Sequence, residues 1–351
     1  MTDAVPTAEQ QLEFLRQLQR LLDEGSFVAS YKYALLHAIA DLCVLRGDDS
    51  GAPLTLETRE LADQFVRLYW RQVAPFPGAA VTDPLKQNRG RQAKVVRVVR
   101  ETHARYDARL GRVERNYEWS RLLRSVEDTV RRMPLWKLQT IGDQRVEFLY
   151  EHREPEHPRA ITLKPGVAYC FRRFYSMIIE MVQGAWTGYI RRTNVHLLGP
   201  DAELRYFLFG SDRQDLSAYR DLLDDVQRGR CFYCDGRMRH DAAVDHFVPW
   251  RRYPFDLGHN FVLAHPSCNG RKGDRLAAVD HLRRWDERNR NDLYELPRRF
   301  AEAGVPHDWD ASIRITRWAY DQVARAGGQV WVRGTVLVPL TGEWEDVLRA
   351  G

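Results

Sequence analysis

The sequence predicts a mainly α protein with small β elements (α+β), in which one short metal-stapled unit of two strands and a helix is embedded among helices. Apolar residues recur at helical spacing in most long segments, whereas the alternation typical of strands is limited to a few short runs. Three of the five cysteines fall in a single stretch, residues 231–268. No internal repeat or low-complexity linker separates that stretch from its neighbours, so it is expected to be part of the fold and not a tethered module.

The first 83 residues are expected to form an N-terminal helical domain. Thr7–Gln10 has the form of a capping box and predicts the start of an amphipathic helix. The nearly continuous apolar run Tyr31–Val44 predicts a buried central helix, and Leu56–Val73 returns to helical spacing. Three helices followed by a basic segment suit a winged-helix-like DNA-binding unit, but they suit a scaffold or protein-contact domain as well.

Residues 84–229 are expected to form a mostly helical central region. A long helix is predicted from Pro84 or Leu85 into the 120s, and helical spacing returns over residues 165–190. The runs 145–150 and 160–163 alternate like strands around a turn that contains proline, which predicts a small hairpin.

A basic stripe lies within this region. Residues 86–115 contain ten Lys and Arg against three acids, a net charge of +7, whereas the whole chain carries +5. Such a stripe could follow the phosphates of DNA. A solvated helix face accounts for it equally well.

Composition restricts the location of the chain. No stretch approaches the length of apolar sequence that a membrane span requires, and the N-terminus lacks the basic and apolar regions of a secretory signal. Five cysteines, three of them in closely spaced positions, do not form a disulfide framework. A cytoplasmic protein without membrane contact is therefore expected.

Two closely spaced ligand pairs predict a structural zinc site. Cys231 and Cys234 form the first pair, and His265 and Cys268 form the second. Three thiolates and one imidazole are a normal tetrahedral ligand set for Zn²⁺. The unit between them is too small to form a core, so zinc, worth on the order of 10 kcal/mol of folding free energy, is expected to hold it together.

The segment between the pairs predicts two strands and a helix. Val244–Val248 is expected to form a strand, Phe261–Ala264 its partner, and Asn269 the start of the helix. Adjacent strand residues point to opposite faces, so Asp245 and His246 can serve one site only if the strand ends or bulges there.

Residues 231–274 resemble the HNH endonucleases of the zinc-containing ββα-metal type, in a His-Asn-Asn version. The residues that carry the resemblance are Cys231, Cys234, Asp245, His246, Asn260, His265, Cys268, Asn269 and Lys272. It covers about an eighth of the chain and departs from the usual pattern at His265, where a cysteine is common. It implies a nuclease module over residues 230–290, and residues 291–351 are expected to pack on the core.

The resemblance implies a metal-dependent DNA endonuclease that hydrolyses phosphodiester bonds by a one-metal mechanism. His246 is then the general base. Asp245 and Asn269 bind a catalytic Mg²⁺ or Mn²⁺. Asn260 orients His246 or its loop, and Lys272 with Arg271 contacts substrate phosphates.

Several alternatives stay open. An inactive zinc-stabilised nucleic-acid-binding or scaffold protein would share the zinc ligands. Asn260 alone is nearly as well explained as a turn residue, and His240 and His259 match no ligand position and are expected on the surface or in loops. Bacterial defence against foreign DNA, with a homodimer or a defence-system partner protein, is a natural setting for such a module by analogy only.

Overall fold

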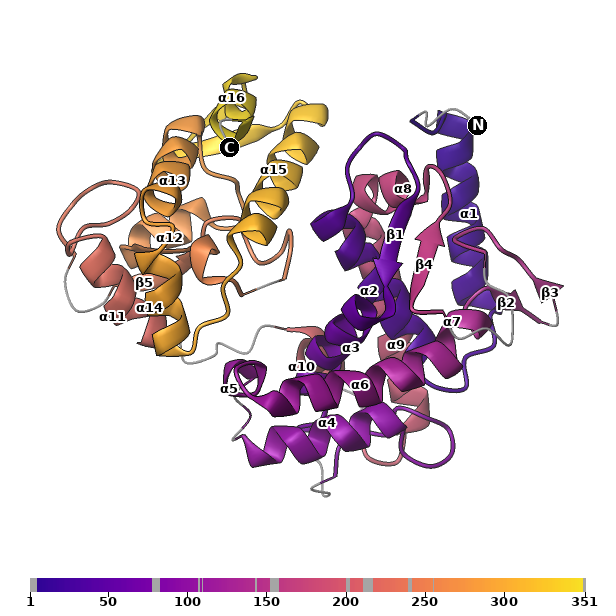
Figure 1. The fold of residues 1–351 in the computed structure, drawn as a ribbon. Helices are drawn as coiled ribbons and strands as arrows, with labels where there is room; N and C mark the ends of the chain where they lie inside the picture. The colour runs from indigo at the N-terminus through magenta and orange to yellow at the C-terminus, as the bar shows by residue number, and fades with distance from the viewer. Residues whose placement is uncertain are drawn as a thin grey trace. The chain divides into compact units, whose positions relative to one another are not determined.

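The computed structural model describes residues 5–77, 83–106, 108, 110–142, 144–151, 158–199, 203–210, 217–238, 242–254 and 256–349 (Figure 1). The chain divides into two compact units, residues 1–210 and 211–351. The division falls inside the expected central region 84–229, and the four segments expected from the sequence stay a prediction. Described helices predominate, and the strands form two-stranded antiparallel sheets, which confirms a mainly α fold with small β elements.

Unit 1 is built from helices around a buried central helix. Its helices are α1 (Ala8–Glu24), α2 (Tyr31–Arg46), α3 (Thr58–Gln72), α4 (Lys94–Arg105), α5 (Leu110–Glu114), α6 (Tyr117–Arg132), α7 (Pro134–Lys137), α8 (Val167–Arg173), α9 (Tyr175–Thr193) and α10 (Leu204–Phe209). Its strands are β1 (Leu54–Glu57), β2 (Thr140–Ile141), β3 (Gln144–Arg145) and β4 (Ala160–Leu163).

The first two helices confirm the sequence signals that predicted them. The Thr7 side chain accepts from the Gln10 backbone N–H, and the Gln10 side chain closes the capping box in return. Helix α2 is buried on nearly every side from Lys32 to Val44 and packs against α3, α8 and α9. A helix that is apolar all round belongs inside a core, and Cys43 is accordingly buried.

The long helix expected from residue 84 into the 120s is wrong. Three shorter helices, α4, α5 and α6, occupy this region. Asn116 begins α6 anew, because its side chain accepts from the Glu118 backbone N–H. Ala108, between α4 and α5, has a positive φ of 61°, which no helix continues.

The small hairpin has different strands from those expected. Strand β4 pairs along its whole length with β1, from Leu54↔Leu163 to Glu57↔Ala160, and touches residues 145–150 only at its end. A single bridge joins Tyr150 to Leu163, and the local hairpin of this region is β2–β3. Antiparallel partners far apart in sequence carry no local signal, so periodicity predicted strand β4 but not its partner.

The basic stripe lies partly along α4. Val95, Val96 and Val99 face the core, and basic residues occupy the exposed side of the helix. Three of these cations are in ion pairs, Lys94–Asp128, Arg100–Asp83 and Arg105–Glu118. Pairing reduces the charge available to phosphates, so contact of this stripe with DNA stays a prediction.

Unit 2 contains residues 231–268, where the predicted zinc ligands lie. Its elements are α11 (Ser217–Val226), β5 (Ala243–His246), the short 3₁₀ helix η1 (Gly258–Asn260), β6 (Phe261–Ala264), α12 (Pro266–Lys272), α13 (Val279–Asn291), α14 (Glu295–Ala303), α15 (Trp309–Arg325), β7 (Gln329–Arg333), β8 (Val336–Pro339) and α16 (Glu343–Arg349). Strands β5 and β6 pair in regular antiparallel register, and α12 follows them directly. The predicted two-strand-plus-helix unit is therefore present, with β6 at its expected bounds.

Flanking helices complete the core of this small unit. Phe261 and Leu263 of β6 pack with Tyr219, Leu222 and Leu223 of α11 and with Leu296 and Phe300 of α14. The expectation that zinc alone supplies its stability is thus too strong, because the surrounding helices bury its apolar face.

The C-terminal residues also pack within unit 2. The β7–β8 hairpin turns at Gly334, whose φ of +54° favours glycine. Trp331 of β7 joins residues 276–278 through backbone hydrogen bonds, and its ring contacts Tyr233 edge-on at 5.1 Å. Among the described residues, no helix is both long and apolar enough to cross a lipid bilayer.

Candidate metal centre and active site

The first pair of metal donors sits in a tight turn before β5. The backbone N–H of Asp235 donates to the Cys231 carbonyl, and the N–H of Cys231 donates to the Gly236 carbonyl. A Cβ on Gly236 would lie 3.2 Å from His265 Cε1 and 3.4 Å from Cys234 Sγ, so the donors close in around this glycine. The Phe232 N–H donates to the Leu263 carbonyl and fixes the turn to β6.

The second pair lies at the start of α12. His265 is the N-cap residue, Pro266 fills the first helical position and Cys268 lies in the first turn. His265 Nε2 is 3.1 Å from the Arg237 carbonyl oxygen, to which it donates, and Nδ1 lies 3.3 Å from Cys234 Sγ and 4.0 Å from Cys268 Sγ. A backbone acceptor on one ring nitrogen, with the other turned to the ligand cluster, is the usual setting of a metal-binding histidine.

The four donors fit a zinc ion. All four donor atoms of Cys231, Cys234, His265 and Cys268 lie within 4.8 Å of one another, and donors around tetrahedral zinc are about 3.5–3.8 Å apart. Burial and the neighbouring Cys231 and Cys234 raise the pKa of Cys268 to about 12. Burial opposes ionisation of Cys231, but backbone N–H groups, among them those of Cys234 and His265, lower its pKa overall. Crowded thiols of this kind ionise together only around a cation, which supports the predicted zinc site.

Asp245 faces the α12 side of the sheet and forms a buried ion pair. Its Oδ2 lies 3.0 Å from Lys272 Nζ and accepts a 2.5 Å hydrogen bond from the Tyr233 hydroxyl. Lys272 is fully buried and also donates to the His246 carbonyl at 2.9 Å. Burial lowers the pKa of Lys272, and Asp245 opposes that shift. The other oxygen, Oδ1, makes no hydrogen bond with any described residue, and the side chain stays 10% exposed.

His246 lies at the end of β5 and faces the opposite side. Its Nε2 is 2.6 Å from Asp256 Oδ1, and its ring packs on Phe261 at 4.6 Å and Trp250 at 5.4 Å. Nδ1 makes no hydrogen bond within the described part of the chain, and it is not enclosed. The ring therefore combines a fixed orientation with one accessible nitrogen.

Asn260 fixes the chain just beyond His246. Its side-chain Oδ1 accepts from the Val248 N–H at 2.8 Å, its Nδ2 donates to the Val248 carbonyl at 3.1 Å, and its own carbonyl accepts from the Phe247 N–H at 2.7 Å. These three bonds tie Asn260 to the two residues after His246. An orienting role for Asn260 in a catalytic site stays a prediction.

Asn269 and Arg271 lie on α12. Asn269 precedes Lys272 by three residues, which places both on one helix face, and Lys272 on that face reaches Asp245 and the His246 carbonyl. The Asn269 side-chain amide makes no hydrogen bond with any described residue and is half-buried. Arg271 is exposed.

The geometry differs from the sequence prediction in three respects. Lys272 was expected to contact phosphate, but its ammonium is enclosed and bound to Asp245, because a buried cation requires an anion beside it. The strand ends at His246 without a bulge, so Asp245 and His246 point to opposite faces. His259, expected on the surface or in a loop, is 1% exposed; His240 lies outside the described residues. Asp256 carried no sequence signal, since a single acid in a loop is ordinary.

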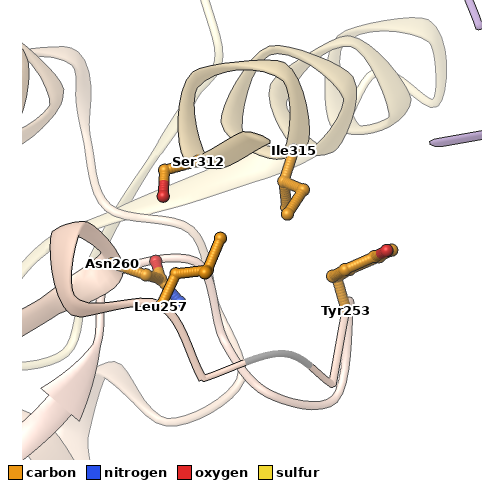
Figure 2. Close-up of a pocket in the computed structure, with 5 residues that line it drawn as sticks. All are labelled: Tyr253, Leu257, Asn260, Ser312 and Ile315. Atoms are coloured by element: carbon orange, nitrogen blue, oxygen red, sulfur yellow. The ribbon is translucent and has the colours of Figure 1, made fainter. Parts of the chain in front are cut away.

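A small pocket lies beside Asn260. Figure 2 shows Tyr253, Leu257 and Asn260 on one loop facing Ser312 and Ile315 of α15. Its walls are mostly apolar, and the described candidate ligands Asp245 and Asn269 do not line it. The pocket is therefore a packing feature that supports the Asn260 loop.

The candidate site is thus a cluster of four metal donors beside a sheet end that carries His246, with Asp245 on the side of β5 that faces α12 and Asn269 on α12 itself. Comparisons of the chain with protein-family models, with curated proteins and with solved structures found no match.

Proposed function

We propose that this protein is a metal-dependent DNA endonuclease of the HNH type, which hydrolyses phosphodiester bonds with His246 as general base. The observation that carries the proposal is that one small unit beside the metal-donor cluster holds an oriented imidazole with an accessible Nδ1 on one side of β5, and two side chains with unpaired oxygens, Asp245 and Asn269, on the α12 side. A neutral imidazole with a free ring nitrogen can take a proton from water.

Asp245 and Asn269 are the residues that would hold a catalytic Mg²⁺ or Mn²⁺. Asp245 Oδ1 is a hard anionic oxygen, and the Asn269 amide oxygen is a neutral one. When bound, such an ion neutralises charge on the phosphate and assists the leaving 3′-oxygen. Lys272 compensates part of the Asp245 charge, so we expect weak binding of the ion in the absence of DNA.

The remaining residues of the proposed site bind and orient. Asn260 holds the backbone after His246, so the imidazole keeps its position relative to the sheet. Arg271 is exposed and would contact a substrate phosphate. Lys272 would not contact a phosphate, because its ammonium binds Asp245 and the His246 carbonyl and so holds the end of β5 in place.

The proposal is tested by plasmid cleavage with Mg²⁺ or Mn²⁺, comparing the parent with His246→Ala. Loss of the general base should lower the cleavage rate by about 100-fold or more. His196→Ala, which removes an exposed histidine of unit 1, is the matched control and should cleave like the parent. Equal, metal-independent cleavage by the parent and His246→Ala would reject the proposal.

A specific observation favours a second candidate, an inactive zinc-stabilised nucleic-acid-binding or scaffold protein. One oxygen of Asp245 is already committed to Lys272 and Tyr233, and His246 faces the other side of the strand. If the zinc-loaded parent binds DNA but cuts neither single- nor double-stranded substrate with either metal, this second function is the better one.

A further inference from the structure

The surroundings of His246 contain an acid that the proposed reaction does not yet use. Asp256, four residues before Asn260, places Oδ1 2.6 Å from His246 Nε2. Both side chains are partly buried, at 18% exposure for His246 and 19% for Asp256. No hydrogen bond or ion pair joins Asp256 to a basic side chain other than His246 in the part of the chain that the structure describes. Its carboxylate is therefore directed at one imidazole nitrogen.

This contact determines which nitrogen of His246 carries the proton. An ionised carboxylate only accepts hydrogen bonds, so a 2.6 Å contact requires Nε2–H to be the donor. The neutral imidazole then has its lone pair on Nδ1, the nitrogen without a described hydrogen-bond partner. Packing of the ring against Phe261 and Trp250 restricts rotation that would exchange the two nitrogens.

We propose that Asp256 is a positioning residue, which holds His246 in the Nε2–H tautomer so that Nδ1 faces the attacking water as the base. The inference rests on the proposed endonuclease function for its effect on rate, but the tautomer itself is a property of the protein alone. When His246 accepts a proton, the Asp256 carboxylate also stabilises the imidazolium without taking the proton itself.

The tautomer is measured first, on the zinc-loaded full chain without substrate or divalent ion. Long-range ¹H–¹⁵N spectra of ¹⁵N-histidine-labelled protein distinguish a protonated Nε2 from a protonated Nδ1, and the His246→Gln spectrum assigns the signal. We expect Nε2–H in the parent. In Asp256→Asn the amide can donate to Nε2, so the signal should shift toward the Nδ1–H form.

The rate is measured second. Asp256→Asn should lower kcat for DNA cleavage about 100-fold with KM within about twofold of the parent, because ring orientation affects the proton transfer and not DNA binding. Asp274→Asn is the matched control: this carboxylate is exposed and pairs with Arg251 on the surface. It should change neither kcat nor the His246 signal. Asp256→Glu keeps the carboxylate and should recover part of the kcat.

The outcomes separate this inference from the proposed function. Nδ1–H in the parent, or cleavage by Asp256→Asn at the parent rate, overturns the positioning role while the endonuclease stands. A shift only in the Mn²⁺ concentration needed for cleavage, with an unchanged His246 signal, also overturns it, because Asp256 would then be a metal ligand. If the parent shows Nε2–H but cleaves no DNA, the endonuclease proposal is refuted, whereas the proposed tautomer of His246 is confirmed. If Asp256→Asn loses zinc, its rate does not test the positioning role. The tautomer seen in the parent spectrum and the kcat of Asp256→Glu then test it instead.

Discussion

Acidification should destabilise the protein through one buried histidine, His259. Its ring is 1% exposed, and both nitrogens are enclosed without a hydrogen-bond partner among the described residues. The ring lies against Phe300 at 5.2 Å and Trp309 at 5.7 Å. Burial, followed by the charge of Arg288 and by His307, lowers the pKa of His259 to about 3.

The sign and size of the effect follow from linkage. The unfolded chain binds a proton at His259 below its ordinary pKa of 6.5, whereas the folded protein binds none until the pH nears 3. Stability is therefore complete above 6.5 and is lost as the pH falls through the interval between the two pKa values. Each pH unit within it costs about 1.4 kcal/mol, so acidification from pH 7 to about pH 5 should remove about 2 kcal/mol of unfolding free energy.

Urea unfolding at both pH values, for the parent and His259→Leu, measures this contribution. Leucine fills a similar apolar volume and does not titrate, so its own cost should stay below about 1.5 kcal/mol at pH 7. Zinc ligands and the other histidines titrate in both proteins, and their effects cancel in the difference. The parent should lose about 2 kcal/mol more than the variant between pH 7 and pH 5. Equal losses in the two proteins would show that His259 is protonated or solvated in the folded state and would refute the reasoning.

Three further predictions concern the zinc cluster and the buried ion pair. Cys234→Ser should lower zinc content, measured by mass spectrometry of the native protein, and unfolding free energy by several kcal/mol, about 3 or more; one retained zinc per chain at full stability would contradict the assigned donors. Asp245→Ala should keep its zinc, and loss of zinc in this variant would mean that the ligands are wrongly assigned. Lys272→Met should cost about 3 kcal/mol in urea unfolding, because it leaves Asp245 partly buried without its cation; a neutral result would show that water reaches the carboxylate.

Local signals in the sequence predicted local structure well. The capping box at Thr7 and the apolar runs of α2 and β6 each depend on a few consecutive residues, and each element formed where it was expected. The clustering of the four metal donors could be predicted because two short spacings and one ligand chemistry define a site that can hold zinc.

Features that depend on partners distant in sequence could not be predicted. The pairing of β1 with β4 has no local signature. Lys272 and Asp256 have ordinary sequence contexts, and only the folded chain shows that one is buried against Asp245 while the other faces His246. The break between α4 and α6 depends on the Asn116 cap. Apolar residues recur at helical spacing on both sides of Asn116, so the periodicity alone did not predict a break there.

Tyr233 connects the turn that carries Cys231 and Cys234 directly to the carboxylate of Asp245. It lies between Cys231 and Cys234, and its hydroxyl donates to Asp245. Replacing zinc by a larger ion such as cadmium would widen the turn, displace the phenol and carry the carboxylate with it. A change of the ion held by the four donors would therefore reach the Asp245 carboxylate by two routes, through the Tyr233 ring and through Lys272 of α12, the helix that also carries Cys268.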